Sequence, residues 1–392
     1  MKPSNYNAQQ QLYCRMQPSG YYAFVPPPLP PELPIDWELA ALLSEADRAV
    51  AELSGAGRLL PNPHLLIRPY LRREAVLSSL IEDTYADVED LLLFDVKPES
   101  AAEKPSVREV ANHIRALEHG LARLSSLPIS TRLIQELHGI LLSDVRGGNA
   151  SKTPGEFRRS QNWIGRPGST LGTASFVPPP PDQLAQCLSD WEKYLNSESR
   201  EPDLVKIALL HYQFEAIHPF LDGNGRMGRL LITLSLCATG LLSEPLLYLS
   251  AFFERHRDDY YRGLLAVSTE GAWKEWIVFF LTGVRTMARE ALIDTRNLVD
   301  LYTHYRRIMD QGKRVPAASA GVLDAIFASP MLTISQHAEQ RNEDYRSVAN
   351  AVLFWQKHGL LEEFTGQKRH RVFIAPRVLE MSRPYTRPSQ KP

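Results

Sequence analysis

Four side chains between His218 and Arg229, in the stretch HPFLDGNGRMGR, have the chemistry that phosphate transfer needs. The imidazole of His218 can accept a proton near neutral pH. Asp222 offers the hard carboxylate oxygen that Mg²⁺ prefers, and Arg226 and Arg229 offer forked cationic donors to phosphate oxygens. Because Arg229 follows Arg226 by three residues, the two guanidinium groups share one face of a helix that begins here.

The glycine-bearing turn Gly223, Asn224 and Gly225 supplies the second half of such a site. It precedes the apolar run LLITLSLCAT, which predicts a helix. The first N–H groups of a helix have no partner within it and lie at its positive end, so this turn can bind an anion through its backbone. Each feature alone is common, but their combination in this order predicts a phosphate-binding functional site.

The stretch resembles, position for position, the signature H-P-F-x-D-G-N-G-R-x-x-R of the Fic (filamentation induced by cAMP) family. The resemblance implies an all-helical catalytic fold and transfer of AMP from ATP to a hydroxyl side chain of a target protein. ATP and that target are therefore the expected partners, with Mg²⁺ as cofactor.

The same resemblance implies a role for each matching residue. His218 deprotonates the target hydroxyl, Asp222 holds Mg²⁺, and Arg229 fixes the γ-phosphate. Phe220 packs inward and sets the loop. The remaining phosphate contacts come from Gly223, Asn224, Gly225 and Arg226.

An inhibitory motif is expected upstream, in the helical segment YLRREAVLSSLIEDTYADVEDLL that follows prolines at 61, 63 and 69. Ser78–Asp83, SSLIED, resembles the family's inhibitory pattern [S/T]-x-x-x-E-[G/N], with Asp83 in place of Gly or Asn. The resemblance implies that Glu82 pairs with Arg229 and leaves ATP in an unproductive pose, with Ser78 at the first position of the pattern. From the residues alone, Glu82 is better explained as a solvated side chain on a surface helix, and only the resemblance favours the inhibitory role.

The glycine- and proline-rich stretch from Gly155 to Pro181 interrupts the helical pattern and predicts a short hairpin. It resembles the flap that, in Fic proteins, holds the target segment by main-chain hydrogen bonds. The resemblance assigns target docking to Thr173, Ala174, Ser175, Phe176 and Val177. An ordinary loop is the alternative.

Several residues outside the His218–Arg229 stretch are candidates for nucleotide contacts or for structural roles. The segment RDDYYRGLLAVSTEG is similar to one that lines the adenine pocket in the family, which implies base contacts for Tyr260 and Ser268. His211 and Glu215 lie along the helix leading to His218, where we expect structural roles. Three other histidines, His113, His119 and His138, are expected to be packing or surface residues, because no neighbour completes a metal set.

Composition sets the broad class of the protein. The chain has 392 residues, 44% of them hydrophobic and 23% charged, with a formal net charge of −1, which is typical of a globular protein and gives no reason to expect an anionic membrane as partner. The three cysteines are scattered, so neither a zinc site nor a disulfide framework is expected. No run of about eighteen apolar residues occurs, and we expect a cytoplasmic protein.

The predicted fold is mainly α: a Fic helical bundle with a small β-hairpin flap, plus a C-terminal winged helix-turn-helix domain. The expected regions are an extended proline-rich arm over 1–35, an N-terminal helical region over 36–110 with the inhibitory helix at about 70–90, a catalytic core over 111–284, a connecting helix over 285–314, a winged-helix-like domain over 315–380 and a tail over 381–392.

Alternatives remain open for the function and for the C-terminal domain. The same site can run in reverse, with Glu82 activating water to remove AMP from a modified protein. The winged helix offers Arg346, Lys368, Arg369 and Arg371 to phosphates, whereas Glu362 and Glu363 oppose DNA. DNA binding by a regulator is therefore the weaker alternative. The helix over 285–314 can connect domains or pair with a second subunit, which would give a homodimer.

Overall fold

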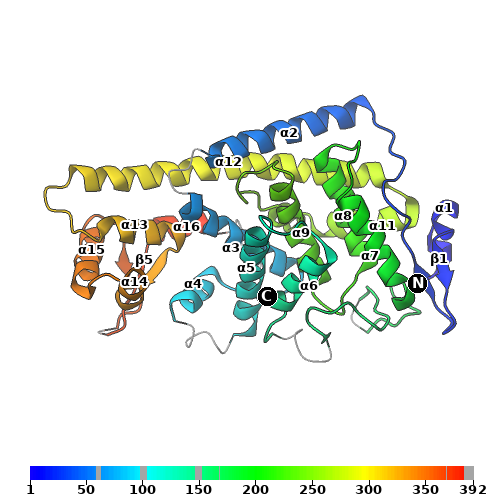
Figure 1. Ribbon diagram of the computed structural model, residues 1–392, viewed down its shortest axis with the longest axis horizontal. Helices are drawn as coiled ribbons and strands as arrows, with labels where there is room; N and C mark the ends of the chain where they lie inside the picture. The colour runs from blue at the N-terminus through cyan, green and yellow to red at the C-terminus, as the bar shows by residue number, and fades with distance from the viewer. Residues whose placement is uncertain (59–62, 98–103, 146–151, 167, 368, 384–392) are drawn as a thin grey trace. The chain divides into compact units, whose positions relative to one another are not determined.

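The computed structural model describes the chain except for residues 59–62, 98–103, 146–151, 167, 368 and 384–392 (Figure 1). It is mainly α-helical, as predicted. The helices are the 3-10 helix η1 (Pro3–Asn5), α1 (Ala8–Gln11), α2 (Trp37–Arg58), α3 (Pro63–Ile81), α4 (Val88–Val96), α5 (Pro105–Arg123), α6 (Thr131–Leu141), α7 (Pro181–Leu195), α8 (Asp203–Ile217), α9 (Asn224–Ala238), α10 (Ser250–Arg255), α11 (Arg257–Glu270), α12 (Trp273–Gln311), α13 (Ser319–Ala328), α14 (Ile334–Arg341), α15 (Tyr345–Lys357) and α16 (Pro376–Ser382). The strands are β1 (Cys14–Met16), β2 (Tyr22–Phe24), β3 (Met331–Thr333), β4 (Glu362–Glu363) and β5 (Val372–Ile374).

The chain divides into two compact units, and each of them combines segments that are separate in the sequence. Unit 1 comprises Met1–Ala51, Asn112–Leu242 and Phe252–Ala288. Unit 2 comprises Glu52–Ala111, Ser243–Ala251 and Arg289–Pro392. The helices α2, α5, α10 and α12 contribute residues to both units. The segment expected to be inhibitory therefore groups with the C-terminal region.

The core of unit 1 is built around α8, which packs against α7, α9 and α11 (Figure 1). Nearly every side chain of α8 from Leu204 to Ile217 is buried. A helix covered on all sides is apolar on all faces, which explains why LVKIALLHYQF shows almost no polar stripe. The rigid helix α8 thus ends directly at His218.

The N-terminal segment is more ordered than the extended arm expected from its prolines. Strands β1 and β2 pair antiparallel, with Cys14 opposite Phe24. Gly20 has φ +81°, a left-handed conformation that glycine adopts at little cost, and it reverses the chain between the strands. Phe24 is fully buried and its ring lies 5.6 Å from that of Tyr6. The Phe24 ring also lies 5.7 Å from that of Phe176, so the segment shares a small aromatic core with the stretch expected to form the flap.

In unit 2, the helix expected to run without a break to Leu92 is two helices. Helix α3 begins at Pro63 and contains Pro69, which the sequence had suggested for the preceding loop. It ends at Ile81, because Asp83 has φ +58° and turns the chain out of the helical path. The side chain of Asp87 then caps α4 by accepting a hydrogen bond from Glu89 N.

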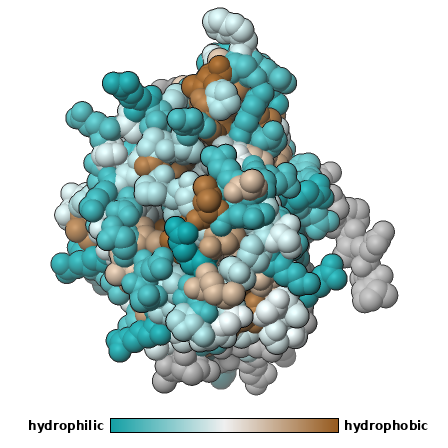
Figure 2. Space-filling model, turned by 90° about the vertical axis from the view of Figure 1, so that its right-hand side faces the viewer, coloured by the Kyte–Doolittle hydropathy of each residue, from teal (hydrophilic) through white to brown (hydrophobic). Residues whose placement is uncertain are grey.

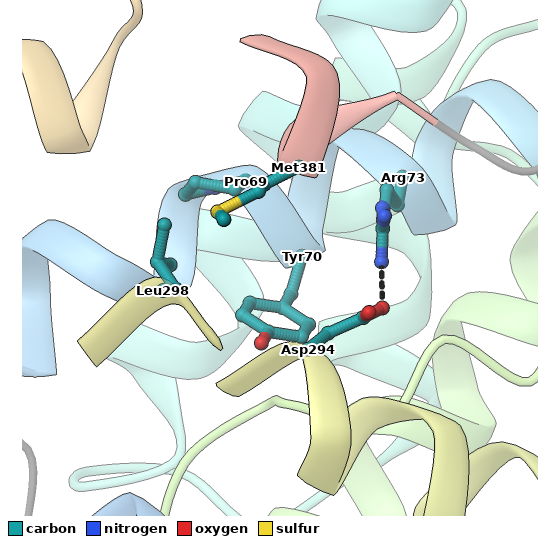
Figure 3. Close-up of a pocket in the computed structure, with 6 residues that line it drawn as sticks. All are labelled: Pro69, Tyr70, Arg73, Asp294, Leu298 and Met381. Carbon is teal, nitrogen blue, oxygen red and sulfur yellow. Dashed lines mark hydrogen bonds and ion pairs between the residues drawn. The ribbon is translucent and has the colours of Figure 1, made fainter. Parts of the chain in front are cut away.

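Three consecutive charged residues in the middle of α3 are buried and anchor it within unit 2. Arg72 pairs with Asp95 of α4 at 2.7 Å and donates to Ala328 O at the end of α13 at 2.9 Å. Arg73 forms an ion pair with Asp294 of α12, and Figure 3 shows the two side chains pointing toward one another. Its guanidinium also donates to Tyr248 Oη and Arg383 O.

The third residue, Glu74, accepts hydrogen bonds from the backbone N and the hydroxyl of Ser250. Breaking one partner of a buried charge pair is strongly destabilising, so these contacts hold α3 firmly against the other elements of unit 2.

The C-terminal region contains the three helices expected from the sequence, α13, α14 and α15. Strand β4 pairs antiparallel with β5 around a turn containing Gly366, and β3 adds a third strand that was not expected, in the order β3-β5-β4. The side chain of Asp344 caps α15 by accepting from Arg346 N. Lys368, one of the proposed phosphate contacts, lies outside the described residues.

The drawn surface is mainly hydrophilic, with hydrophobic residues in small separate patches (Figure 2). Within the part of the chain that the structure describes, no helix has the length and hydropathy needed to cross a bilayer.

Candidate functional site

The loop between α8 and α9 is shaped by two left-handed residues. His218, at the end of α8, has φ +49° and its N–H still donates to Phe214 O at 3.0 Å. Gly223, which precedes α9, has φ +73°. For a residue other than glycine, a left-handed conformation costs about 1–3 kcal/mol. The loop contacts described below hold His218 in this conformation.

The imidazole of His218 has a defined tautomer. Its Nδ1 lies 3.2 Å from the carbonyl oxygen of Glu215. A carbonyl only accepts, so Nδ1 carries the hydrogen and the lone pair of the neutral ring is on Nε2. A histidine in this state is prepared to act as a base through Nε2.

The side chain of Asn224 forms hydrogen bonds with the backbone of the loop. Its Oδ1 accepts from Phe220 N at 2.8 Å and its Nδ2 donates to Phe220 O at 2.9 Å. The Asn224 side chain is thus occupied by the loop, so any contribution of this residue to anion binding comes from its backbone. Phe220 itself is fully buried.

His138 of α6, predicted to be a packing or surface residue, packs against the loop between α8 and α9. Its ring stacks on that of Phe220, with centroids 3.6 Å apart and planes 5° from parallel. Nδ1 accepts from Gly155 N at 2.9 Å, so Nε2 carries the hydrogen and donates to Asp222 O at 3.0 Å. His138 therefore supports both the aromatic anchor of the loop and the backbone of the predicted Mg²⁺ ligand.

Burial lowers the pKa of His138 from 6.5 to about 4, and the charge of Arg226 adds to the lowering. The unfolded chain binds a proton near pH 6.5, whereas the folded protein stays neutral at this position down to about pH 4. Acidification between these values therefore favours the unfolded state. At pH 5 we expect the folded protein to lose about 2 kcal/mol through His138 relative to neutral pH.

Urea unfolding of the parent and of His138→Gln at pH 7 and pH 5 tests this expectation. The difference in unfolding free energy between the two pH values should be smaller in the variant. His119→Gln is the matched control, because the His119 side chain is 41% exposed. A pH dependence that His138→Gln leaves unchanged would contradict the assignment.

Two buried arginines give the site its positive charge. Arg226 and Arg229 lie in the first two turns of α9 and are 5% and 1% exposed. Their charges also lower the pKa of the fully buried His113, to about 3, after the larger effect of burial. Together with the positive end of α9, these guanidinium groups favour a bound anion.

Asp222 remains accessible beside this cluster. Its side chain is 39% exposed, and Oδ1 lies 3.9 Å from Arg226 Nη2. The described residues contain no group of three or more His, Cys, Asp or Glu side chains arranged for a metal. A single carboxylate fits Mg²⁺, which commonly binds through one or two carboxylates together with substrate phosphates and water.

The two residues predicted to contact adenine, Tyr260 and Ser268, are both buried in the structure. Tyr260 is 1% exposed, and its hydroxyl lies 2.9 Å from His211 Nε2. Ser268 is 2% exposed and its hydroxyl is paired with that of Tyr212 at 2.8 Å. Both side chains are buried in the core around α11, where their hydroxyl groups have hydrogen-bond partners inside the protein. His211 has the structural position expected for it.

The predicted flap consists of a single antiparallel bridge between Ile164 and Phe176. The alternation of its residues is clear: Thr173 and Ser175 are exposed, whereas Ala174 and Phe176 are buried. The backbone of Phe176 is paired in both directions with Ile164, and Val177 O accepts from Phe24 N at 2.8 Å. Phe176 therefore has no backbone group to offer a target in this conformation, contrary to the docking role expected for it.

Comparison with known proteins agrees with this arrangement. Residues 40–122 match the model of the Fic/DOC family N-terminal region, and residues 128–236, which include the whole His218–Arg229 stretch, match that of the Fic/DOC family. The chain belongs to the Fic/DOC family. Helices α6 to α9 of this Fic protein lie almost wholly within the second match.

Curated relatives of the Fic protein include the protein adenylyltransferases Fic of Drosophila yakuba and Drosophila ananassae. Each is 32% identical over 158 residues, which is 40% of this chain and 28% of the relative. The chain thus spans less than a third of their length. The crystal structure of a Fic family protein from Desulfovibrio desulfuricans covers 88% of this chain and 98% of its own, with a TM-score of 0.57 and 20% identity, which shows the shared fold.

Proposed function

We propose that this Fic protein transfers AMP from ATP to a hydroxyl side chain of a target protein. The observation that carries the proposal is the position of His218. Its Nε2 lone pair is fixed by the Nδ1 contact to Glu215 O, on the same loop that leads into the buried arginines of α9. The names of the Drosophila relatives support the same activity.

In the proposed reaction, Nε2 of His218 removes the proton from the target hydroxyl. The hydroxyl oxygen forms a bond to the α-phosphorus of ATP, the bond from that phosphorus to the bridging oxygen breaks, and pyrophosphate leaves. The product is a phosphodiester between AMP and the target. Arg226 and the backbone of Gly223–Gly225 hold phosphate oxygens, and Arg229 holds the γ-phosphate.

Asp222 is the residue that would hold Mg²⁺, which neutralises phosphate charge when it is bound. Such transfers need little covalent chemistry from the protein, so most of the acceleration comes from positioning and electrostatic stabilisation.

We also propose that Ser78–Asp83 is an inhibitory motif and that Glu82 keeps ATP from its productive pose. The backbone supports this reading of the motif. Glu82 follows the end of α3 and is exposed, and Asp83 has φ +58°. The family pattern has Gly or Asn at this last position, and both tolerate a left-handed conformation, as Asp does. The substitution of Asp for them therefore preserves the same turn.

Parallel reactions with ATP labelled at the α- or the γ-phosphate test the proposed transfer. The protein, Mg²⁺ and a cell lysate are incubated with each label, and protein-bound label is measured after denaturing electrophoresis. Relative to lysate alone, we expect the added protein to increase α-label on target proteins and on the Fic protein itself and to leave γ-label unchanged, because kinases of the lysate transfer the γ-phosphate in both samples. An increase of protein-bound γ-label caused by the added protein would indicate phosphoryl transfer and would contradict the proposal.

Removal of AMP from a modified protein is the alternative at the same site, with Glu82 as the group that activates water. Intact-mass measurement of a labelled target separates the two reactions. A target that gains the mass of AMP with ATP present supports transfer, and a modified target that loses it when only the protein is added supports removal.

DNA binding by the C-terminal region stays the weaker alternative. Arg346 lies in the first turn of α15, but the acidic Glu362 and Glu363 form β4. A gel-shift assay with genomic fragments would detect it, and analytical ultracentrifugation would test the proposed homodimer.

A further inference from the structure

Arg158, near the start of the predicted flap, is a buried cation whose described partners are backbone carbonyls. Its side chain is almost fully inaccessible, at 2% exposure for the residue. Nε donates to His218 O at 2.9 Å, and Nη2 donates to Pro179 O at 2.6 Å and Ile217 O at 3.3 Å. Nη1 donates to Ser160 O at 3.3 Å.

Burial lowers the pKa of Arg158 to about 10, so the guanidinium remains protonated at neutral pH. A buried charge is tolerated only when its donors are satisfied. Here the planar guanidinium of Arg158 donates hydrogen bonds to several carbonyl oxygens in fixed directions, and the ammonium group of a lysine cannot reproduce this geometry. The backbone N–H of Arg158 also donates to Pro219 O at 2.9 Å.

Asn162, two residues after Ser160 in the sequence, also contacts the loop between α8 and α9. Its Nδ2 donates to His218 O at 3.3 Å and to Phe220 O at 2.8 Å. The carbonyl of His218 is therefore held by two side chains, and the peptide groups from Ile217 to Phe220 are each held by Arg158 or Asn162. None of these contacts involves the imidazole itself.

We propose that Arg158 and Asn162 are positioning residues for His218. They hold its peptide carbonyl, and thereby the left-handed backbone at φ +49° that keeps Nδ1 on Glu215 O. The same guanidinium binds Ser160 and Pro179, at the two ends of the flap, so it joins the flap to the histidine through a single group. This inference rests on the proposed role of His218 as the base.

The test uses AMP transfer in a Glu82→Gly background, in which the proposed inhibition is removed. Arg158→Gln and Asn162→Asp each remove donors to the carbonyls, and Asn162→Asp keeps the shape of the side chain. Displacement of a catalytic group by about 1 Å can lower the reaction rate about 100-fold. We therefore expect kcat to fall about 10- to 100-fold in each variant. The KM for ATP should change less than about 3-fold, since neither residue is assigned to the phosphates.

Two matched variants make the comparison specific. Arg159→Gln removes the same charge next in sequence, where the side chain is 88% exposed and pairs with Glu156 at 3.1 Å, and it should leave kcat unchanged. Arg158→Lys keeps the charge without the fork, and it should recover only part of the activity that Arg158→Gln loses. Full recovery by Lys would overturn the role given to the guanidinium geometry.

A second measurement is independent of activity. ¹⁵N spectra of imidazole-labelled protein, with His218 assigned by its absence in His218→Ala, report the Nδ1–H tautomer. We expect this tautomer in the parent and in Arg159→Gln, and a tautomeric mixture in Asn162→Asp and Arg158→Gln. Should Arg158→Gln fail to fold by circular dichroism, Asn162→Asp decides the matter alone.

The activity assay and the ¹⁵N spectra test the proposed AMP transfer and the positioning role separately. Absence of AMP transfer by the Glu82→Gly parent would overturn the proposed function, while the spectra still decide whether the carbonyl contacts position His218. Unchanged kcat and an unchanged tautomer in Asn162→Asp would overturn the positioning role.

Discussion

His218→Ala is expected to abolish detectable AMP transfer. Removal of a general base typically lowers a rate by about 10²- to 10⁴-fold. The methyl group of alanine cannot accept the proton that Nε2 of His218 accepts. Three other histidines, His113, His138 and His211, are poor substitutes as bases, because burial lowers the pKa of each. Initial rates with α-labelled ATP in the Glu82→Gly background measure the effect.

ATP binding provides the control for this variant. The imidazole is assigned to the hydroxyl proton and not to the phosphates, so the Kd for ATP from calorimetry should stay within about 3-fold of the parent. His119→Ala, at an exposed position on α5, should keep full activity. Retention of transfer by a folded His218→Ala protein would remove the base from the proposed mechanism.

The second large effect is expected for Glu82→Gly, which should raise AMP transfer about 10- to 100-fold. A hydrogen bond involving a charged group contributes about 1.5–3 kcal/mol, and removing the inhibitory carboxylate makes that amount available to productive ATP. Label should increase both on the target and on the Fic protein itself. The measurement is initial incorporation of α-label at a fixed ATP concentration.

Glu198→Gly, at another exposed glutamate, controls for the loss of charge and for the added glycine. Glu82→Gln separates the carboxylate charge from side-chain size and should activate to a smaller extent, because an amide can still accept a hydrogen bond. Equal labelling by the parent and Glu82→Gly would contradict the inhibitory assignment.

The part of this site that could be predicted from the sequence is the part encoded within one short stretch. His218, Asp222, Arg226 and Arg229 are local to one loop and one helix, so their spacing alone indicates that they converge. The helical class follows in the same way from apolar periodicity, and the family matches confirm the resemblance that the stretch suggested.

What could not be predicted depends on contacts between distant residues. His138 meets Asp222 across 84 positions and Arg158 meets His218 across 60, and neither has a local pattern that indicates its partner. The end of α3 was missed for a different reason. Helical propensity in SSLIEDTY gives no warning of the left-handed Asp83, which is set by the turn that follows.

The burial of Tyr260 shows the limit of reasoning by resemblance. Matching a tyrosine in sequence fixes its place on α11, but the direction of its hydroxyl depends on what packs around it. Here His211 supplies a hydrogen-bond partner inside the core. The sequence position of this tyrosine could be predicted, whereas its burial could not.

The anchoring of α3 by Arg72, Arg73 and Glu74 restricts how its far end can change. The helix cannot slide or rotate as a body without separating buried charges from α4, α12 and the start of α10. The turn after Ser79 lies beyond these anchors, and its backbone includes the hydrogen bond from Glu82 N to Ser79 O at 3.1 Å. Any movement of Glu82 therefore has to occur in the turn after Ser79, while the middle of the helix stays in place.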